Sequence, residues 1–469
     1  MKKTTNGKLF ATTTALASLC AGLAWGAEPD YPPGHEGFDH YYDWKLQPVR
    51  VDTTNAYYHK CGGHDFTDPM HGPWLTNPGE TTMTVSFIGW NRTGAGIRYW
   101  PKGKRDQTKD VWLTTYGMVD FSKDVHHFHL TGLKPGTDYE YKLMTVSSKH
   151  VTACFRSVVG RATYSFRTLD AAKESYRVFV TSDLHGYASV VLDNAYDAAG
   201  GKDADLCFLL GDNVDDNMNE PRPYITRGFL DDVIRLWGRE KPTVILRGNH
   251  DSWGLHAAEA WGEYFARPDQ RAYYAFRHGP ALFVALDTAA EPYFSRDKQP
   301  VSGEVASAYR DEQAAWLKAL KETPLWKEAK FRVVMNHYGT RTDAYGSGFF
   351  FQTGKLLKPI LNDTTPEGRI HLFLCGDEHR YARVNANSAE VVQSPDDKPL
   401  TFKDPKRKAY PQVVDTSWNF TEVCCTCRGE GLSLDVSPEK LTVTSYRVKN
   451  GRGGILDRVE IGPDGQVIK

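Results

Sequence analysis

Hydrophobic and polar residues alternate in two different ways along the chain. Between residues 82 and 168, short runs alternate with period two, which is the pattern of strands with one buried face. These runs are 82–87, 96–100, 126–130, 133–143 and 164–168. Short strands separated by turn residues predict a small all-β sandwich over 79–169. His127 and His129 fall on one face of their strand, and we expect that face to be exposed.

After a polar linker at 168–175, near-continuous apolar runs alternate with segments of helical periodicity. The runs that predict buried strands are 176–181, 206–210, 243–246, 281–286, 331–335 and 370–375. The expected helices are 187–199, 227–237 and 313–320. Strands that alternate with helices predict a layered α/β domain over 176–465, and alternating runs between 431 and 461 are expected to complete its sheets.

The N-terminal part has a different composition. Residues 1–27 show the order of a secretory signal peptide, with a lysine-containing start, an apolar run at 9–23 and a small-residue region at its end. That run is too short and too rich in Thr for a confident transmembrane span, and no other segment is long and apolar enough to be one. Residues 28–78 lack periodicity and predict an irregular arm. We therefore expect an exported protein, periplasmic or secreted.

The charge and the cysteine content bear on nucleic-acid binding and on disulfide pairing. The 57 Lys and Arg residues balance 58 Asp and Glu residues, for a net charge of −1, which argues against nucleic-acid binding through an overall basic field. Eight cysteines include Cys20 in the signal, so an odd number remains and at least one is expected to be a free thiol or unusually paired. Cys207 and Cys375 are expected to be small buried hydrophobes. Cys424, Cys425 and Cys427 are expected to form a local disulfide or to pack, and Cys61 and Cys154 are a candidate pair.

Five polar clusters each follow one of the apolar strands. They are Asp183-Leu184-His185-Gly186, Gly211-Asp212-Asn213-Val214-Asp215, Gly248-Asn249-His250-Asp251, Asn336-His337 and Gly376-Asp377-Glu378-His379. Loops at the carboxyl ends of strands converge in α/β sheets, and His, Asp and Asn are ligands that suit Mn, Fe or Zn. Each cluster alone is typical turn chemistry. All five in order favour one metal site.

The order of these clusters closely resembles the calcineurin-like metallophosphoesterase superfamily. The preceding sandwich, with a Leu-Lys-Pro-Gly-Thr-x-Tyr stretch that places Tyr139 at a strand corner, resembles a fibronectin type III module. Together they look most like the purple acid phosphatase branch, over about residues 80–461. The resemblance implies a four-layer α/β/β/α sandwich with two divalent metal ions (Mn, Fe or Zn) and a small-molecule phosphate ester as substrate.

The resemblance also implies residue roles. Asp212 would bridge the two ions and a metal-bound hydroxide would attack phosphorus, while His250 would protonate the leaving oxygen with Asp251 orienting it. The first ion would be held by Asp183, His185, Asp212 and His379, and the second by Asp212, Asn249, His337 and Asp377.

Two positions depart from the family pattern. Purple acid phosphatases have a tyrosine ligand to ferric iron where this chain has Asp215, so a colourless protein is expected. The family's Gly-His-x-His element has Asp377 in place of its first histidine. We expect the second site to be retained and shifted toward Mn²⁺ or Fe²⁺, because aspartate is the harder ligand. The alternative is a weakened second site with low activity.

An exported monoesterase of the acid phosphatase kind is the first functional hypothesis. A phosphodiesterase or nucleotidase would share all five clusters, and an exported binding protein with a degenerate site is the non-catalytic alternative. Aromatic residues at 293–295 and 345–351 could line a pocket or belong to the core. Arg380 could contact phosphate or be a surface residue.

Overall fold

Ten segments of the chain are described by the computed structural model. They are residues 69–89, 94–148, 155–215, 221–265, 267–288, 303–341, 353–394, 417–426, 430–449 and 452–468. The signal sequence, most of the arm and the segments 293–295 and 345–351 lie outside the described residues. Among the described helices, none has the length and apolar character needed to cross a membrane.

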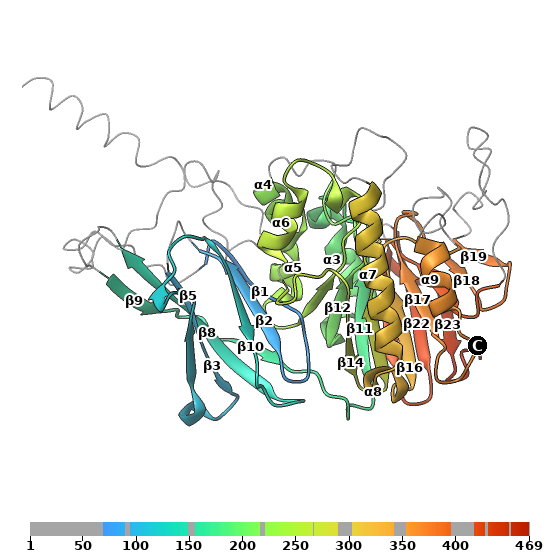
Figure 1. Ribbon diagram of the computed structural model, residues 1–469, viewed down its shortest axis with the longest axis horizontal. Coiled ribbons are helices and arrows are strands. Elements are labelled where there is room, and N and C mark those ends of the chain that lie inside the picture. The colour runs from blue at the N-terminus through green and yellow to red at the C-terminus, as the bar shows by residue number, and fades with distance from the viewer. Residues whose placement is uncertain are drawn as a thin grey trace, which may run out of the picture. The chain divides into compact units, whose positions relative to one another are not determined.

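The N-terminal part is an all-β sandwich, as the period-two runs predict (Figure 1). One sheet has the order β1 (His71–Thr76), β2 (Met83–Ile88), β7 (Val125–Leu130). The other has the order β10 (Tyr164–Arg167), β8 (Asp138–Ser148), β3 (Gly94–Pro101), β4 (Lys109–Trp112), with β9 (Phe155–Val159) also paired to β8. A hairpin joins β5 (Thr114–Thr115) to β6 (Met118–Val119). The Tyr139 hydroxyl accepts a hydrogen bond from the Lys134 N–H at 3.0 Å, so this tyrosine lies at the expected corner.

Strand β1 falls within the predicted irregular arm, and the structure corrects that expectation. All six residues of this strand are buried, so its sequence shows no alternation of polar and apolar positions. It also contains Gly72 and Pro73, which are uncommon in strands. Pairing with β2 supplies the hydrogen bonds that its local sequence does not predict.

The expected exposed face of β7 is exposed only in part. His129 is exposed, whereas the Nε2–H of His127 donates to the Glu263 carbonyl oxygen in α6 (Ala257–Tyr264) at 2.6 Å. Burial lowers the pKa of His127 to about 4. The sandwich therefore contacts the second half of the chain through this strand.

The second half is built on two sheets. The six-stranded sheet has the order β13 (Thr243–Ile245), β12 (Leu206–Leu209), β11 (Tyr176–Thr181), β21 (Glu430–Val436), β22 (Leu441–Lys449), β23 (Arg452–Ile461). The seven-stranded sheet has the order β14 (Tyr274–His278), β15 (Ala281–Ala285), β16 (Phe331–Met335), β17 (Leu372–Cys375), β20 (Thr421–Cys424), β18 (Ala382–Val384), β19 (Val391–Gln393). As predicted, the strands after residue 430 complete one of these sheets, and β21 pairs antiparallel with β11.

Helices cover the outer faces of both sheets, which gives the expected four layers (Figure 1). On one side are α3 (Ala188–Ala198) and a helical segment at 221–238, and on the other are α7 (Gly303–Lys321) and α9 (Thr353–Leu361). The segment 221–238 consists of α4 (Pro221–Ile225), the π-helical η3 (Thr226–Leu230), α5 (Asp231–Val233) and the π-helical η4 (Ile234–Gly238). The shorter elements are α8 (Pro324–Lys327), η1 (Arg105–Gln107), η2 (Gly201–Asp203) and η5 (His250–Ser252).

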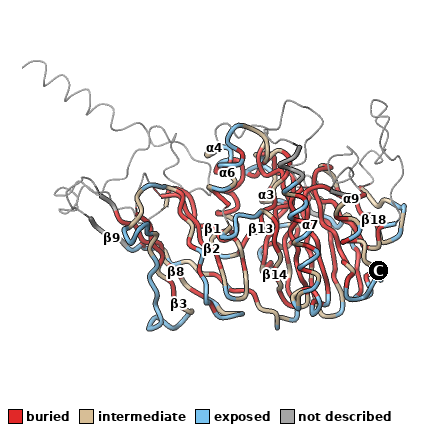
Figure 2. Tube along the Cα trace, in the orientation of Figure 1, coloured by how far each residue is buried: buried red, intermediate tan, exposed pale blue. Residues whose placement is uncertain are grey.

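Strand β11 illustrates why the central strands are apolar throughout. Val178 and Val180 pack in the core between the two sheets, while Phe179 contacts the rings of Tyr196 and Trp237 on the helical side. Both faces are therefore buried, and Figure 2 shows the same for the neighbouring strands.

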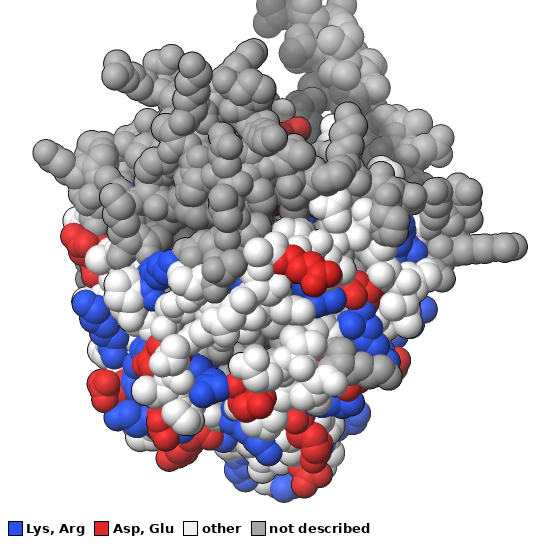
Figure 3. All heavy atoms as spheres, turned by 90° about the vertical axis from the view of Figure 1, so that its right-hand side faces the viewer, with Lys and Arg blue, Asp and Glu red and all other residues white. Residues whose placement is uncertain are grey.

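On the surface in Figure 3, basic and acidic residues are interspersed, in keeping with the balanced composition.

The four described cysteines, Cys207, Cys375, Cys424 and Cys425, are buried and form no disulfide with one another. Cys207 and Cys375 are buried as expected. Cys424 and Cys425 belong to different hydrophobic clusters, one on each side of the seven-stranded sheet. These two neighbours therefore pack rather than form a disulfide with each other. Cys61, Cys154 and Cys427 lie outside the described residues.

Candidate metal centre

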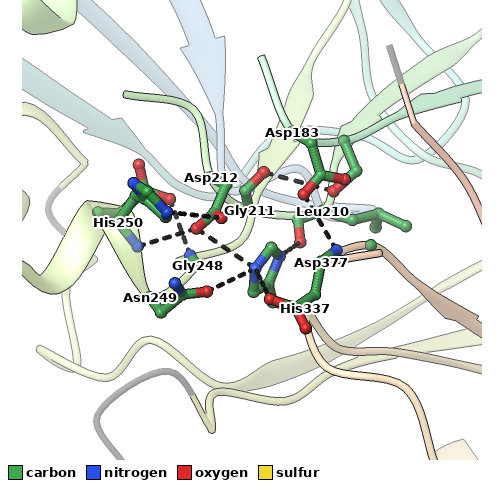
Figure 4. A network of polar contacts seen from close by, with 12 residues as sticks. Asp183, Leu210, Gly211, Asp212, Gly248, Asn249, His250, His337 and Asp377 are labelled. Carbon is green, nitrogen blue, oxygen red and sulfur yellow. Dashed lines mark hydrogen bonds and ion pairs between the residues drawn. The ribbon is translucent and has the colours of Figure 1, made fainter. Parts of the chain in front are cut away.

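The five polar clusters meet at the carboxyl ends of strands from both sheets. Strands β11, β12 and β13 of the six-stranded sheet lead into the loops that carry Asp183, Asp212 and Asn249. Strands β16 and β17 of the seven-stranded sheet lead into those that carry His337 and Asp377. Figure 4 shows these side chains converging on one another. The convergence predicted from strand ends is thus present, with the two sheets supplying opposite sides.

One group of possible ligands consists of Asp183, His185, Asp212 and His379, whose donor atoms lie within 4.8 Å of one another. The Nε2 atoms of His185 and His379 are 2.9 Å apart. His185 Nε2 lies 3.6 Å from Asp212 Oδ2, and His379 Nε2 lies 3.6 Å from Asp183 Oδ1. Four donors facing one point are suited to a single cation.

A second group consists of Asp212, His337 and Asp377. His337 Nε2 lies 3.3 Å from Asp212 Oδ1, 3.7 Å from Asp377 Oδ1 and 3.0 Å from the Asn249 side-chain oxygen. Its Nδ1–H donates to the Leu210 carbonyl oxygen at 2.9 Å, which orients Nε2 toward the other ligands. Because Asp212 belongs to both groups, with one oxygen toward each, it is placed to bridge two cations.

The electrostatics of these groups fit divalent cations. Asp183, Asp212 and Asp377 are 1%, 1% and 6% exposed, so three buried carboxylates lie within these closely spaced groups. Burial, together with the charges of Asp212 and Asp377, raises the pKa of Asp183 well above its usual value. Burial alone would lower the pKa of His337, but the surrounding carboxylates raise it to about 10. Clustered buried carboxylates are costly without cations, and these residues are ligands that divalent metals accept.

The backbone at the ligand positions is unusual. Asp183, His185, Asp212, Asp377 and His379 have φ values of 59°, 46°, 50°, 74° and 54°. These account for five of the nine non-glycine residues with positive φ in the described segments. The left-handed conformation is uncommon for residues with a Cβ atom, and such strain concentrates at functional sites.

Glycine permits the close approach of two of these loops. A Cβ atom at Gly248 would overlap the Asp212 backbone nitrogen and Oδ1. The loop after β13 can therefore lie directly against the Asp212 carboxylate only because this position lacks a side chain. The His250 backbone N–H donates to Asp212 Oδ1 at 2.9 Å and fixes that carboxylate further.

His250 lies beside the ligands and faces two carboxylates. Its Nε2 is 3.9 Å from Asp212 Oδ2, and its Nδ1 is 3.4 Å from Asp215 Oδ1. His185, Asp215 and His250 also form a third group of closely spaced donors. Asp215, considered in the sequence only as a replacement for tyrosine, is therefore the carboxylate beside the Nδ1 of His250.

Asp251 has different partners. Its Oδ1 accepts from the N–H groups of Asn213 and Val214 at 3.0 and 3.1 Å, and its Oδ2 accepts from the Gly248 N–H at 2.8 Å and the Asn213 side chain at 3.0 Å. Burial and the charge of Asp212 raise the pKa of Asp251 to about 6. The Asp251 carboxylate thus joins the loops after β12 and β13.

Family comparisons agree with this geometry. The purple acid phosphatase N-terminal domain family model matches residues 72–168, and the calcineurin-like phosphoesterase family model matches residues 176–381. Residues 176–381 thus match the calcineurin-like phosphoesterase family. The two matches confirm the family resemblance and its four-layer fold, and the first includes β1 in the N-terminal domain.

Individual relatives of the phosphoesterase domain are distant. The chain is similar to purple acid phosphatase 15 of Arabidopsis thaliana, with 23% identity over 356 residues that cover 65% of this chain and 62% of that protein. The chain thus spans less than two thirds of that relative's length. A solved structure of PhoD has a TM-score of 0.55 with 13% identity, covering 85% of this chain and 91% of the PhoD chain. This second match shows likeness of fold.

Two further side chains next to the site are those of Arg380, considered from the sequence as a phosphate contact, and Trp253. The Arg380 guanidinium donates from Nε to the Glu378 carbonyl oxygen at 3.3 Å and lies 3.9 Å from the Glu378 carboxylate. It is therefore held against its own loop. Trp253 was not singled out from the sequence, but its ring lies 4.1 Å from that of His250, between centroids. Its only sequence signal is its position three residues after His250.

Proposed function

We propose that this protein is an exported metal-dependent phosphoesterase that hydrolyses phosphate monoesters, in the manner of an acid phosphatase. The observation that carries the proposal is the position of Asp212, which is shared by two buried ligand groups and lies 3.9 Å from the Nε2 of His250. A bridging carboxylate and an adjacent imidazole are suited to phosphoryl transfer to water. The signal-like first 27 residues support export.

The proposed ligands are Asp183, His185, Asp212 and His379 for one cation and Asp212, Asn249, His337 and Asp377 for the other. Two divalent ions bound there would polarise the phosphoryl oxygens and lower the pKa of water. Asp377 supports Mn²⁺ or Fe²⁺ at the second position, and Asp215 in place of a tyrosine supports a colourless protein.

His250 is the proposed general acid. Its Nε2 faces Asp212 and the ligand groups, so a proton on this atom is directed at the oxygen that leaves phosphorus. Asp215 lies beside Nδ1 and is placed to hold the ring in position. We propose this positioning role for Asp215. For Asp251, from which the sequence predicts the same role, the hydrogen bonds support a role in holding two loops together.

Hydrolysis of 4-nitrophenyl phosphate and bis(4-nitrophenyl) phosphate, with Mn²⁺, Zn²⁺ or Fe²⁺ added, tests the proposal. We expect the monoester to be hydrolysed faster and Asp212→Asn to lower kcat by more than about 100-fold. Asp106→Asn, at an exposed position in the sandwich, is the matched control and should retain activity. Faster diester hydrolysis would favour the phosphodiesterase alternative. Failure to hydrolyse either ester would favour the non-catalytic binding protein.

A further inference from the structure

A row of aromatic rings extends from the metal ligands to Trp253. Ring centroids are separated by 4.6 Å between His379 and His185, 4.5 Å between His185 and His250, and 4.1 Å between His250 and Trp253. The first two rings belong to the proposed ligands and the third to the proposed general acid. Trp253 is the next ring in the row beyond the acid.

The local backbone fixes Trp253 beside His250. Residues His250–Ser252 form the short helix η5, and the Trp253 N–H donates to the His250 carbonyl oxygen at 3.2 Å. The two rings are tilted by 40°, so the indole covers one side of the imidazole. The Trp253 side chain is only partly buried, and Leu255, two residues further, is 86% exposed. Apolar side chains therefore follow the general acid closely in sequence, and those of Trp253 and Leu255 both reach solvent.

The chemistry of hydrolysis determines what meets this surface. His250 protonates the oxygen that leaves phosphorus, so this oxygen lies within hydrogen-bond reach of His250 in the reacting complex. The carbon atoms bonded to that oxygen must then lie beside His250, on the side away from the phosphoryl group. A flat apolar group in this position would gain contact with an indole ring, whereas a small polyol would gain little.

We propose that Trp253 and Leu255 form the leaving-group wall of the site and select phosphate esters with an aromatic leaving group. The proposal rests on the proposed function, because it needs His250 as the acid. Trp253 acts on specificity through direct contact with the departing group, and the P–O bond is broken by the same residues whichever ester is bound.

The test compares phenyl phosphate with glycerol 2-phosphate in the metal-loaded enzyme and its Trp253→Ala, Trp253→Phe and Leu255→Ser variants. We expect Trp253→Ala to lower kcat/KM about tenfold for phenyl phosphate and less than about twofold for glycerol 2-phosphate. Trp253→Phe should recover most of the loss, and Leu255→Ser should show a smaller loss on phenyl phosphate alone. Tyr116→Ala, at a 95% exposed aromatic in the β5–β6 hairpin, should change neither ester.

The comparison of two esters separates specificity from other effects of the substitution. If Trp253 only supported His250, Trp253→Ala would lower kcat/KM by the same factor for both esters and shift its pH profile for both. That result would overturn the proposal. If Trp253→Ala misfolds, the test rests on Trp253→Phe and Leu255→Ser. A ratio of kcat/KM for phenyl phosphate to kcat/KM for glycerol 2-phosphate that is unchanged in both variants would also overturn the proposal. A wild-type enzyme inactive on both esters would instead refute the proposed function and this inference with it.

Discussion

His371 provides a sharp test of the electrostatics of the buried core. The residue is 1% exposed and directly precedes β17, at the opposite end of that strand from Asp377. Its Nδ1 accepts from the Arg332 N–H at 3.1 Å, and its Nε2–H donates to the Pro463 carbonyl oxygen at 3.0 Å. Both hydrogen bonds require a neutral ring, since protonation of Nδ1 would set two N–H groups against each other.

The magnitude follows from the pKa of His371. Burial, followed by the charges of Arg332 and Arg369, lowers this pKa to about 4, against 6.5 for an ordinary histidine, although the Pro463 carbonyl and Asp464 act in the opposite direction. The unfolded chain therefore binds more protons between these two pH values, and stability falls as the pH drops through 6.5 toward 4. Linkage gives a loss of about 2 kcal/mol between pH 7 and pH 5 from this one residue.

Urea unfolding of the metal-loaded protein at pH 7 and pH 5 measures the effect. His371→Asn removes the titrating group while offering an oxygen to the Arg332 N–H, so its stability should fall by about 2 kcal/mol less than that of the wild type over this interval. His256→Asn, at an exposed histidine in the same domain, is the control and should follow the wild type. Equal losses in all three proteins would refute the assignment of a buried neutral His371.

Further predictions concern the ligand loops. Asp377→His should keep two bound divalent ions, as in the wild type, and shift the second toward Zn²⁺, measured by elemental analysis; one ion in the wild type and two in the variant would contradict a retained second site. Asp251→Asn should lower the free energy of unfolding in urea by about 2 kcal/mol, because its amide group would face backbone N–H donors. Asp215→Asn should instead lower kcat and leave the free energy of unfolding in urea nearly unchanged. Gly248→Ala should reduce activity by more than about 100-fold, since its Cβ would displace Asp212, and normal kcat would show that the loop can move.

The phosphoesterase sheets could be predicted well because their strands are buried on both faces. The apolar runs at 176–181 and 331–335 coincide with β11 and β16 at both ends, since polar residues begin where the strands leave the core. Strand β1 could not be found in this way, because its pairing with β2 is set by tertiary contacts. The same limit applies to His127, whose partner Glu263 is 136 residues away.

The site was predictable in its composition but not in the direction of each side chain. Asp251 is adjacent to His250 in sequence and was expected to orient it. Consecutive residues in a helical turn point apart, and the Asp251 carboxylate is occupied by N–H groups of Gly248, Asn213 and Val214. Asp215, distant from His250 in sequence, lies beside it because the loops after β12 and β13 run together.

Five proposed metal ligands have a strained backbone, and the metal ions they would bind explain how a chain of balanced charge could attract phosphate. A left-handed conformation costs about 1 kcal/mol or more at each non-glycine residue, and five proposed ligands adopt it. The flanking strands hold these loops in place and bring the carboxylates close together. That arrangement is unfavourable for Asp183, whose raised pKa reports it, and favourable for divalent cations. A nearly neutral chain can therefore create a positive site for phosphate, because bound metal ions would supply the charge that its Lys and Arg residues do not.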